Sequence, residues 1–310
     1  MIQPQIQFRR DRPEPTRLSI LTPFYKETPV ALLEALGRDR AMRTGRVDVI
    51  LIDDGSGQPA LTGSVISCLE AQPYPATLIT LSENAGRAAG RNRLMAASRS
   101  RYFLFLDSDM LPDSPDFIQT WLDVMDQECP PVAFGGISLE QASHDQAVAL
   151  HRAMASHSDT VKAEVRRLSP EKYVFTSNLL VRHDILAEEA FDPAFTGWGW
   201  EDVEWSMRVS RRWDIVHVDN PATHLGLDSA EVLAAKYEQS VTNFARVVAA
   251  HRDIVSAYPG YKAARLLKMA PFRQLWRPML KAVALTSSLP VRLRALSMRL
   301  YRAALYAEAV

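Results

Sequence analysis

The chain has 310 residues, of which 47% are hydrophobic and 23% are charged, so it can bury a sizeable core and has an ordinary globular composition. Its two cysteines, Cys68 and Cys129, exclude a disulfide framework and indicate a reducing compartment. The polar, Pro-rich start lacks the apolar core of a signal peptide, and no apolar run reaches the length of a spanning helix, so we expect a cytoplasmic protein.

The formal net charge of zero hides an uneven distribution. Between residues 254 and 307 the chain has ten basic residues and no acidic one, which leaves 26 basic against 36 acidic residues elsewhere. The ten are Lys262, Arg265, Lys268, Arg273, Arg277, Lys281, Arg292, Arg294, Arg299 and Arg302. This pattern predicts a separate C-terminal unit with an anionic partner.

Strands and helices alternate through the first third of the chain. Residues 1–16 are expected to form an irregular arm. Four strands are predicted, at residues 17–22, 47–52, 77–81 and 102–106. Helices are predicted between them, beginning after Thr28–Pro29, near Leu61 and at Arg87. This order predicts right-handed crossovers and therefore an α/β fold with a mostly parallel sheet.

The stretch from Tyr102 to Asp109 ends in two carboxylates. Its five apolar or aromatic residues, up to Leu106, are typical of a strand buried on both faces. Asp107 and Asp109 follow at the carboxyl end, where open α/β sheets bind ligands. Carboxylates this close repel each other unless a cation lies beside them, and oxygen ligands suit Mg²⁺ or Mn²⁺. Because Asp-Ser-Asp before Leu-Pro is also typical of a turn, the stretch alone predicts either a metal site or a turn.

Every strand in this half is followed by polar or turn-forming residues. They are Pro23, Tyr25 and Glu27 after the first strand, Asp53 and Asp54 after the second, Asn84, Gly86 and Arg87 after the third, and Asp107 and Asp109 after the fourth. Asp53-Asp54-Gly-Ser by itself is typical of a solvated loop. Four such endings together predict a polar rim at one edge of the sheet, whose carboxylates suit ribose and base and whose Arg87 or Arg91 suits phosphate.

The ordered set of Asp53-Asp54-Gly-Ser, Asn84-x-Gly86-Arg87, Arg91-Asn92 and Asp107-Ser108-Asp109 resembles family-2-type glycosyltransferases with the GT-A fold. The resemblance covers about residues 18–227. It implies a Rossmann-like, mostly parallel mixed sheet flanked by helices, a nucleotide-sugar donor, most often a UDP-sugar, and Mn²⁺ or Mg²⁺. It implies further that Asp53 or Asp54 contacts the base, that Asp107 lies near the ribose, and that Asp109 holds the metal. The other residues expected to bind the nucleotide-sugar are Pro23, Tyr25, Glu27, Asn84, Gly86, Arg87, Arg91 and Ser108.

The second half holds a segment rich in tryptophan, glycine and acidic residues, from Gly197 to Trp205. It follows two further predicted strands, at 132–139 and 174–181. Gly197 and Gly199 allow backbone conformations closed to other residues, and Trp198 and Trp200 offer flat faces that stack on sugar rings. Glu201, Asp202 and Glu204 open a predicted helix, where acidic residues also complement the helix dipole. Dipole complementation does not explain the two tryptophans interleaved with glycines.

This segment resembles the Trp-Gly-x-Glu-Asp acceptor motif of chain-extending glycosyltransferases. The resemblance implies that Trp198, Gly199 and Trp200 form the acceptor site, with Glu201 orienting the acceptor and Asp202 as general base. A base without a protein nucleophile implies inversion at the anomeric carbon. We therefore expect an inverting hexosyl- or N-acetylhexosaminyltransferase in polysaccharide or glycoconjugate synthesis. The alternatives are a catalytically silent glycan-binding or scaffold subunit and a sugar nucleotidyltransferase.

The histidines divide into two groups. His224 follows a strand predicted at 214–218, in a region where related enzymes often recruit a metal ligand, so it is a candidate ligand, whereas His217 is expected to be a strand residue. The other five carry no motif and are expected to be surface or structural residues: His144, His151, His157, His183 and His251.

The chain ends in a strong helix, predicted at 231–251, and a basic tail broken by prolines. In the last piece, Leu293, Leu296 and Leu300 share one helix face, which suits an anionic membrane surface but also suits packing on the protein. No nucleic-acid-binding motif accompanies the charge, so we expect peripheral membrane association through residues 261–310 and no nucleic-acid partner. The expected parts are an arm (1–16), a catalytic domain (17–252) with a nucleotide-sugar half (17–110) and an acceptor half (111–252), and a basic helical tail (253–310).

Overall fold

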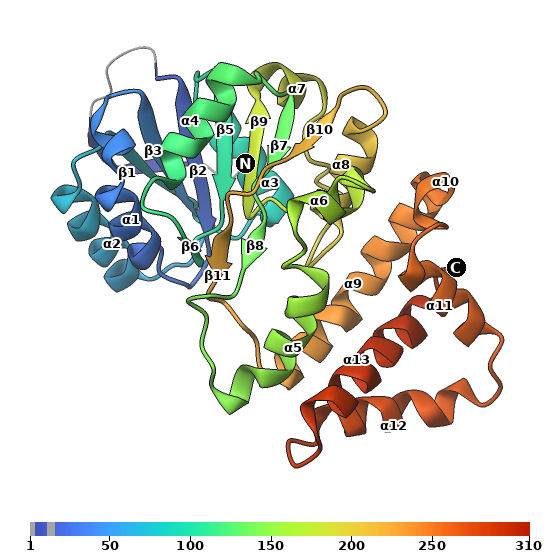
Figure 1. Ribbon diagram of the computed structural model, residues 1–310. Coiled ribbons are helices and arrows are strands. Elements are labelled where there is room, and N and C mark those ends of the chain that lie inside the picture. Colours follow the sequence, from blue (N-terminus) through green and yellow to red (C-terminus); the bar gives the residue numbers. More distant parts are fainter. Residues whose placement is uncertain (1–3, 11–15) are drawn as a thin grey trace.

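The computed structural model describes residues 4–10 and 16–310 and contains two sheets (Figure 1). The larger has eight strands in the order β1 (Gln5–Arg10), β4 (Ala76–Thr80), β3 (Val47–Asp53), β2 (Leu18–Phe24), β5 (Tyr102–Leu106), β9 (Asn178–Arg182), β7 (Val132–Phe134) and β10 (Ile215–His217). The smaller has three, in the order β6 (Met110–Pro112), β11 (Ala222–His224) and β8 (Ile137–Ser138).

The four predicted N-terminal strands form the parallel part of the larger sheet. β2 pairs in parallel with both β3 and β5, and β3 pairs in parallel with β4. β9 is antiparallel to its neighbours β5 and β7, so the sheet is mixed. The predicted fold class, an α/β fold with a mostly parallel mixed sheet flanked by helices, is confirmed.

Both faces of this sheet are covered by helices. α1 (Val30–Arg38), α2 (Pro59–Ala71) and α4 (Phe117–Gln127) pack on one face with alternate strand residues such as Leu104. α3 (Arg87–Ala96), α7 (His183–Glu188) and α8 (Glu201–Val209) pack on the other with the intervening residues, such as Phe103 and Phe105. The apolar run of the central strand therefore fills two cores, as a strand buried on both faces requires.

The N-terminal prediction is wrong where the structure describes it. Gln5–Arg10 forms β1, which pairs antiparallel with the edge of β4, whereas we expected an irregular arm. Phe8 packs on the main core, and the guanidinium of Arg10 donates to the carbonyl oxygens of Glu70 and Gln72. These contacts lie more than 50 residues away in the chain, so no local pattern indicates them. Residues 1–3 and 11–15 of the expected arm lie outside the described residues.

The strand predicted at 132–139 is two strands, because the chain leaves one sheet for the other at Gly135–Gly136. A Cβ at position 135 would lie 2.5 Å from Asn178 Nδ2, and Gly136 has a φ of +99°. Both positions therefore require glycine. The Asn178 amide donates to the carbonyl oxygens of Gly136 and Asn220 and so ties β9 to the crossing point.

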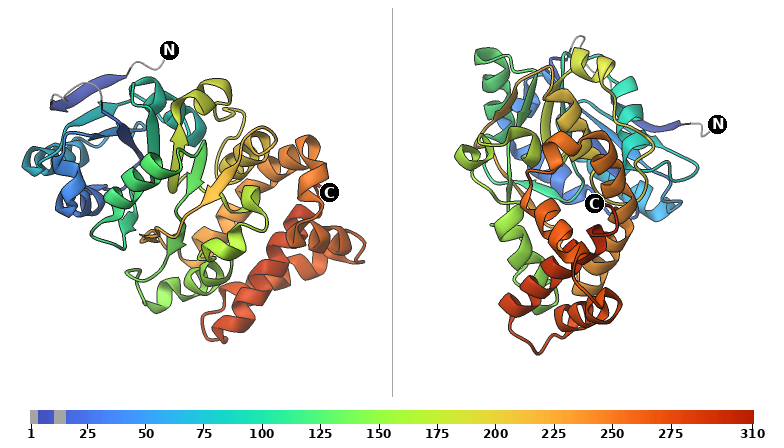
Figure 2. Two further views of the ribbon diagram at one scale, coloured as in Figure 1. Left: turned by 45° about the horizontal axis from the view of Figure 1, so that its top comes forward. Right: turned by 90° about the vertical axis from the view of Figure 1, so that its right-hand side faces the viewer.

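The C-terminal helices fold back onto α5 (Ala149–Ser158) and α8. They are α9 (Ala230–Ala250), α10 (Arg252–Val255), α11 (Pro259–Lys268), α12 (Arg273–Leu285) and α13 (Val291–Tyr306). The elements between β8 and β9 are η2 (Gln146–Val148), α5 (Ala149–Ser158), α6 (Ala163–Arg166) and η3 (Pro170–Tyr173), and η1 (Arg40–Arg43) follows α1. Figure 2 shows α13 lying along the long helix α9, and side chains of α5, α8, α9 and α13 share one core. Within the described residues, none of these helices is long and apolar enough to span a bilayer.

Candidate active site

The carboxyl ends of β3 and β5 bring the predicted donor-side carboxylates to one edge of the sheet. Asp53 is the last residue of β3, and its Oδ1 accepts the backbone N–H of Ser56 at 2.8 Å. Asp54 accepts the N–H groups of Ala85 and Gly86 at 2.8 and 3.0 Å. Burial nevertheless raises the pKa of Asp54, because it outweighs these hydrogen bonds. The Asp54 carboxylate is thus committed to the loop after β4, and Asp53 is the better candidate for contacting a nucleotide base.

The loop after β4 is held by the same aspartate. The Asn84 amide donates to the Asp54 carbonyl oxygen at 3.1 Å, and Gly86, with a φ of +86°, precedes the first residue of α3. A Cβ at Gly55 would lie 2.2 Å from the Glu83 carbonyl carbon, so the two loops touch. Asn84 and Gly86 were predicted to bind the nucleotide; in the structure they join the ends of β3 and β4.

Two arginines of α3 approach Glu201, and one of them, Arg91, also holds Asp107. Arg91 is 1% exposed, and its Nη2 donates to Asp107 Oδ1 at 3.0 Å while its Nη1 lies 3.6 Å from Glu201 Oε1. Arg87, whose side chain is 47% exposed, approaches the same Glu201 oxygen at 3.8 Å. Arg91 is therefore too enclosed to be the first choice for phosphate, and Arg87 is the accessible one.

Asp109 and His224 meet because of strand register. β11 runs antiparallel to β6 with His224 opposite Met110, which places the imidazole beside the preceding residue, Asp109. His224 Nε2 lies 3.1 Å from Asp109 Oδ2. Burial opposes charge on both groups, but their mutual hydrogen bond and attraction outweigh it, so the pKa of Asp109 is lowered and that of His224 is raised.

The chemistry of this pair fits a divalent cation, whose remaining ligands would have to come from elsewhere, such as a substrate. A carboxylate and an imidazole suit Mn²⁺, and metal sites of phosphate-transferring enzymes often use one or two protein ligands with phosphate oxygens. A Cβ at Gly226 would lie 2.0 Å from Asp109 Oδ2 and 3.3 Å from His224 Nε2, so glycine keeps the pair open. Among the described residues, no group of three or more His, Cys, Asp or Glu side chains is placed to hold a metal by itself.

His151 was expected to be surface or structural, yet it stands beside this pair. Its ring lies edge-on to His224, with centroids 6.1 Å apart, and its Nδ1 accepts the backbone N–H of Asp228 at 2.7 Å. Lys236 Nζ donates to Asp228 Oδ2 at 2.6 Å. Burial, together with the negative charge of Asp109, raises the pKa of Glu27 from the β2 side. No local signal distinguishes His151, because α5 brings it in from the excursion between β8 and β9.

The other predicted donor-side residues surround this edge. Pro23 lies in β2. Tyr25 is 41% exposed, and Lys26 Nζ lies 4.8 Å from its ring centroid. The backbone N–H of Lys26 donates to Ser56 Oγ at 2.7 Å, which joins the ends of β2 and β3. Ser108, between the two aspartates, is 8% exposed.

The segment before α8 has an unusual backbone. Gly197, Gly199 and Trp200 have φ values of +73°, +87° and +77°. The tryptophan is the costly one, because a bulky residue rarely adopts this conformation. The backbone N–H of Glu204 donates to the Trp200 carbonyl oxygen at 2.8 Å, so the helix carrying Glu201 and Asp202 starts directly from this strained residue.

The two tryptophans have different surroundings. Both rings are half-buried, and Trp198 has Tyr237 edge-on at 5.8 Å and Lys236 Nζ 6.0 Å from its ring centroid. Trp200 lies 4.9 Å from the Phe244 ring, and its Nε1 donates to Tyr306 Oη at 2.9 Å. The sequence predicted that both stack on an acceptor sugar; Trp200 packs on α9 and α13 instead, and Trp198 stays a candidate for that role.

Asp202 has the electrostatic setting of a base. Its burial and the adjacent negative charge of Glu201 raise its pKa from 3.8 to about 7, although Arg91 and Arg87 act in the opposite direction. Such a carboxylate takes up a proton near neutral pH far more readily than an ordinary aspartate. Glu201, which is 4% exposed, faces the arginines of α3, so it acts as their counter-charge rather than an open acceptor contact.

The sequence matches the family model Glycosyl transferase family 2 over residues 19–188, more than half of the chain. The chain belongs to this family. A separate comparison of the sequence with curated proteins found no match. The match ends before the Trp-Gly segment, so it rests on the donor side of this glycosyltransferase and not on Asp202.

Solved structures share the GT-A fold of this glycosyltransferase at low identity. The mannosyltransferase PcManGT from Pyrobaculum calidifontis, in complex with GDP-Man and Mn²⁺, has 14% identity and a TM-score of 0.62, over 96% of this chain and 88% of that one. TarS residues 1–349 from S. aureus in complex with UDP has 14% identity and a TM-score of 0.52, over 95% and 90%. The same TarS fragment with UDP-GlcNAc has 15% identity and a TM-score of 0.51, over 93% and 90%.

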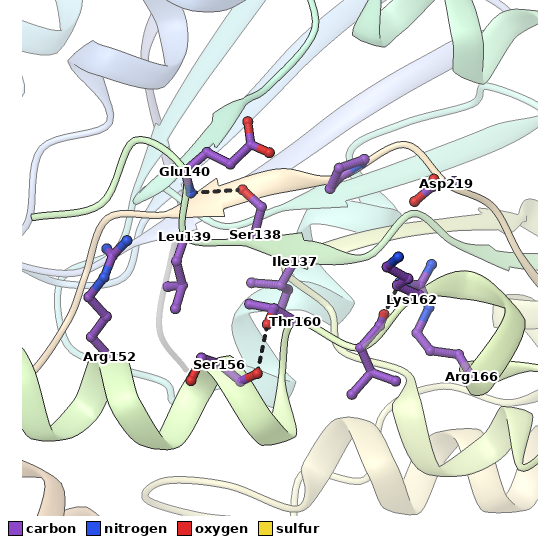
Figure 3. Close-up of a pocket in the computed structure, with 12 residues that line it drawn as sticks. Ile137, Ser138, Leu139, Glu140, Arg152, Ser156, Thr160, Lys162, Arg166 and Asp219 are labelled. Atoms are coloured by element: carbon purple, nitrogen blue, oxygen red, sulfur yellow. Dashed lines mark hydrogen bonds between the residues drawn. The ribbon is translucent and has the colours of Figure 1, made fainter. Parts of the chain in front are cut away.

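A pocket of about 420 Å³ lies away from these residues, between β8, α5 and α6 (Figure 3). None of the predicted site residues lines it. Arg166 in its wall donates to His217 Nδ1 and to the carbonyl oxygens of Val161 and Val218, and burial lowers its pKa to about 10. The pocket's most enclosed charge is thus already used in holding β10, where His217 lies as predicted.

Proposed function

We propose that this glycosyltransferase moves a sugar from a nucleotide-sugar donor, most simply a UDP-sugar, to a hydroxyl of a glycan or lipid-linked acceptor, with inversion and with Mn²⁺ or Mg²⁺. The transferred group would be a hexose or an N-acetylhexosamine, and the product would belong to a polysaccharide or glycoconjugate. The complexes of the structural neighbours with GDP-Man and Mn²⁺, UDP and UDP-GlcNAc support this class of donor.

One observation carries the proposal: a single buried side chain, Arg91, joins the donor aspartate to the acceptor segment. Arg91 lies within 3.0 Å of Asp107 and within 3.6 Å of Glu201, which is adjacent to Asp202. The Asp-x-Asp motif and the Glu-Asp pair therefore form one site, although about 90 residues separate them. A nucleotide-binding subunit without chemistry has no need to hold a carboxylate of raised pKa beside its donor.

Each residue then has a role in the transfer. Asp53 would bind the base, Asp107 and Ser108 the ribose, and Arg87 the diphosphate. Asp109 and His224 would hold the cation, which, when bound, neutralises charge on the diphosphate as it departs. Asp202 would take the proton of the acceptor hydroxyl as that oxygen attacks the anomeric carbon, and Trp198 would hold the acceptor ring.

The test is nucleotide release from a panel of sugar nucleotides, measured with Mn²⁺, with Mg²⁺ and with a chelator. We expect metal-dependent release from one donor, which would also identify the sugar. Because hydrolysis without acceptor is slow in such enzymes, calorimetric binding of UDP and GDP with Mn²⁺ is measured on the same samples. Absence of both release and metal-dependent nucleotide binding would contradict the proposed function.

We propose further that α11, α12 and α13 rest on an anionic membrane surface, at the cytoplasmic face that the sequence predicts. Of the thirteen large apolar side chains exposed among the described residues, eight lie between residues 266 and 300, with exposures from 37% to 85%. They are Leu266, Met269, Phe272, Leu275, Met279, Leu293, Leu296 and Leu300. Lys262 and Arg265 of α11 and Arg292 of α13 are exposed as well. Exposed apolar residues with nearby cations suit the interface of an anionic bilayer.

Charge alone supports this surface less than the sequence suggested. Arg294 is 4% exposed and donates to the Ala284 carbonyl oxygen, while Lys281 pairs with Glu238 at 2.6 Å. These cations serve packing rather than a membrane. The predicted leucine face, in contrast, points outward: Leu293, Leu296 and Leu300 are 45%, 53% and 37% exposed.

The membrane proposal is tested by co-sedimentation with vesicles of phosphatidylcholine, with and without phosphatidylglycerol. Replacing Phe272 and Leu275 with glutamate should abolish sedimentation with the mixed vesicles. Leu168→Glu is the matched control, because Leu168 is 81% exposed but lies between α6 and η3. Deleting the tail is a poor test, since α13 fills the core shared with α9. Equal binding by both variants would contradict a role for this surface.

A further inference from the structure

We propose that Tyr306, near the C-terminus, is a positioning residue for the acceptor segment 197–202. Its phenol is the centre of a short chain of hydrogen bonds that fixes the indole of Trp200. By fixing Trp200 it also fixes the start of α8, and hence the place of Asp202. This inference rests on the proposed function for the role of Asp202, but the contacts that carry it lie outside the donor side.

The hydrogen bonds around Tyr306 have only one consistent direction. The Trp200 indole can only donate, so its Nε1 donates to Tyr306 Oη at 2.9 Å. The Tyr306 hydroxyl then donates to Ser240 Oγ at 2.7 Å, and Ser240 donates to the Tyr237 carbonyl oxygen at 2.7 Å. The chain ends on the backbone of α9. Tyr306 is 5% exposed and Ser240 is fully buried, so water does not replace these partners easily.

Aromatic packing fixes the same side chains. The Phe244 and Tyr306 rings are stacked with centroids 4.2 Å apart, and Trp200 lies 4.9 Å from Phe244 and 5.9 Å from Tyr306. The Asn243 amide adds hydrogen bonds to the carbonyl oxygens of Thr196 and Gly199, at 2.9 and 2.8 Å. Side chains of α9 and α13 thus hold the segment in place through packing and hydrogen bonds.

The backbone conformation of the segment depends on such stabilising contacts. Trp200 has a φ of +77°, which costs of order 1 kcal/mol or more in a residue with a bulky side chain, and persists only where the surroundings enforce it. Two glycines with positive φ precede it, so the chain before Trp200 has little stiffness of its own. Its carbonyl oxygen accepts the first hydrogen bond of α8, two residues before Asp202. Loss of the contacts with α9 and α13 should therefore loosen Asp202, whereas the donor-side loops keep their own hydrogen bonds.

The experiment compares Tyr306→Phe with Tyr301→Phe in the full chain. Tyr301 lies on the same helix, is 4% exposed and loses one hydrogen bond, to Glu238 Oε1 at 2.7 Å, which does not involve the acceptor segment. The first readout is hydrogen exchange of peptides covering residues 197–204. Losing a hydrogen bond worth about 1 kcal/mol should speed exchange roughly five- to tenfold in Tyr306→Phe, and Tyr301→Phe should match the wild type there.

The second readout is hydrolysis of the donor identified by the nucleotide-release panel, with Mn²⁺–UDP binding stoichiometry as the measure of folded protein. Tyr306→Phe should lower kcat roughly fivefold or more with unchanged donor KM and unchanged stoichiometry. A purely structural role would change exchange and kcat equally in the two variants and would overturn the proposal. Wild-type exchange and kcat in Tyr306→Phe would overturn it as well.

Two further comparisons distinguish a failure of this proposal from a folding defect and from a failure of the proposed function. If Tyr306→Phe does not fold, Ser240→Ala removes the acceptor of the same hydroxyl while keeping the phenol ring, and the same results are expected of it. If the wild type neither binds nor hydrolyses a nucleotide sugar, the proposed function fails. The exchange comparison then still decides whether Tyr306 fixes segment 197–202.

Discussion

The donor side and the acceptor side of this glycosyltransferase are held in place by different means. On the donor side, Asp53 and Asp107 stand at the carboxyl ends of β3 and β5, the two strands that flank β2, and Asp54 joins the loops after β3 and β4 through the backbone N–H of Ala85. On the acceptor side, the segment around Trp200 is fixed by Asn243, more than 40 residues later, and by Tyr306, 106 residues later. The donor side is therefore a local product of strand and turn, whereas the acceptor side depends on the C-terminal helices.

The largest effect should come from the base that the acceptor side positions. Asp202→Asn keeps the shape of the side chain but removes the proton acceptor, so transfer should fall about 10²- to 10⁴-fold. Donor affinity should be unchanged, because the donor contacts lie on the other side of the site. Rates are measured as acceptor-stimulated nucleotide release and affinity as Mn²⁺–UDP binding.

Glu204→Gln serves as the control for Asp202→Asn. Glu204 stands on the same helix turn, but it pairs with Arg208 and with His251, away from the donor. Its variant should be less stable and yet keep most of the rate per folded molecule. A rate for Asp202→Asn close to that of the wild type would remove Asp202 from the role of base.

The next effect tests the cation site on the donor side. Asp109→Ala removes the carboxylate ligand, and activity should fall at least about a hundredfold, because metal stabilisation of charge is worth several kcal/mol. Gly226→Ala keeps both ligands, but its new Cβ would lie 2.0 Å from Asp109 Oδ2. Manganese binding, followed by electron paramagnetic resonance, should weaken in both variants.

Gly63→Ala is the matched control for Gly226→Ala, since an added Cβ at position 63 meets nothing within 4 Å. It should leave manganese binding unchanged. Unchanged manganese binding in Asp109→Ala would move the cation site elsewhere, whereas unchanged binding in Gly226→Ala alone would mean that the loop shifts to make room.

The same difference explains what sequence could predict. The apolar run before Asp107, the alternation of strands and helices, and the polar strand endings are local signals, and they predicted the fold and the donor edge. The Trp-Gly-x-Glu-Asp pattern is also local, and it identified the segment before α8. His224 was named as a candidate ligand only through the family resemblance, because its contact with Asp109 is set by the pairing of β6 and β11.

The missed features depend on contacts between distant elements. His151 carries no motif and reaches His224 from α5, and Gly226 matters only because the Asp109–His224 pair lies against it. β1 forms only because the edge of β4 is available to it. Trp200 has the same residue type as Trp198, and only the position of α13 makes it a packing residue. A single sequence shows residue types but not which distant helix covers them.

Substitution of the two tryptophans should have a smaller effect, and it distinguishes acceptor binding by Trp198 from structural packing by Trp200. Trp200→Ala removes a ring packed on Phe244 and Tyr306 and should cost about 2–4 kcal/mol of unfolding free energy, with a lower transfer rate. Trp198→Ala should cost less, because its ring has one aromatic neighbour, Tyr237, where Trp200 has two and a hydrogen bond, but it should raise the KM for the acceptor. Urea unfolding and acceptor titration measure the two quantities. Equal unfolding free energies for the two variants would contradict the division of roles.

The smallest effect is the dependence of stability on pH at Asp202. Its pKa of about 7 lies above the ordinary 3.8, so between these values the folded chain binds more protons than the unfolded chain, and stability falls as the pH rises through that range. Asp202→Asn has no carboxylate to titrate, so its stability should not fall in this way as the pH rises. Its melting temperature should exceed that of the wild type at pH 8 by a few degrees, at roughly 2–4 °C for each kcal/mol, and by much less at pH 5. The same titration predicts that transfer by the wild type declines below about pH 7, because the base is then protonated. A melting difference that is equal at pH 5 and pH 8 would show that the Asp202 carboxylate is not held in the buried, negatively charged setting on which its role as a base depends.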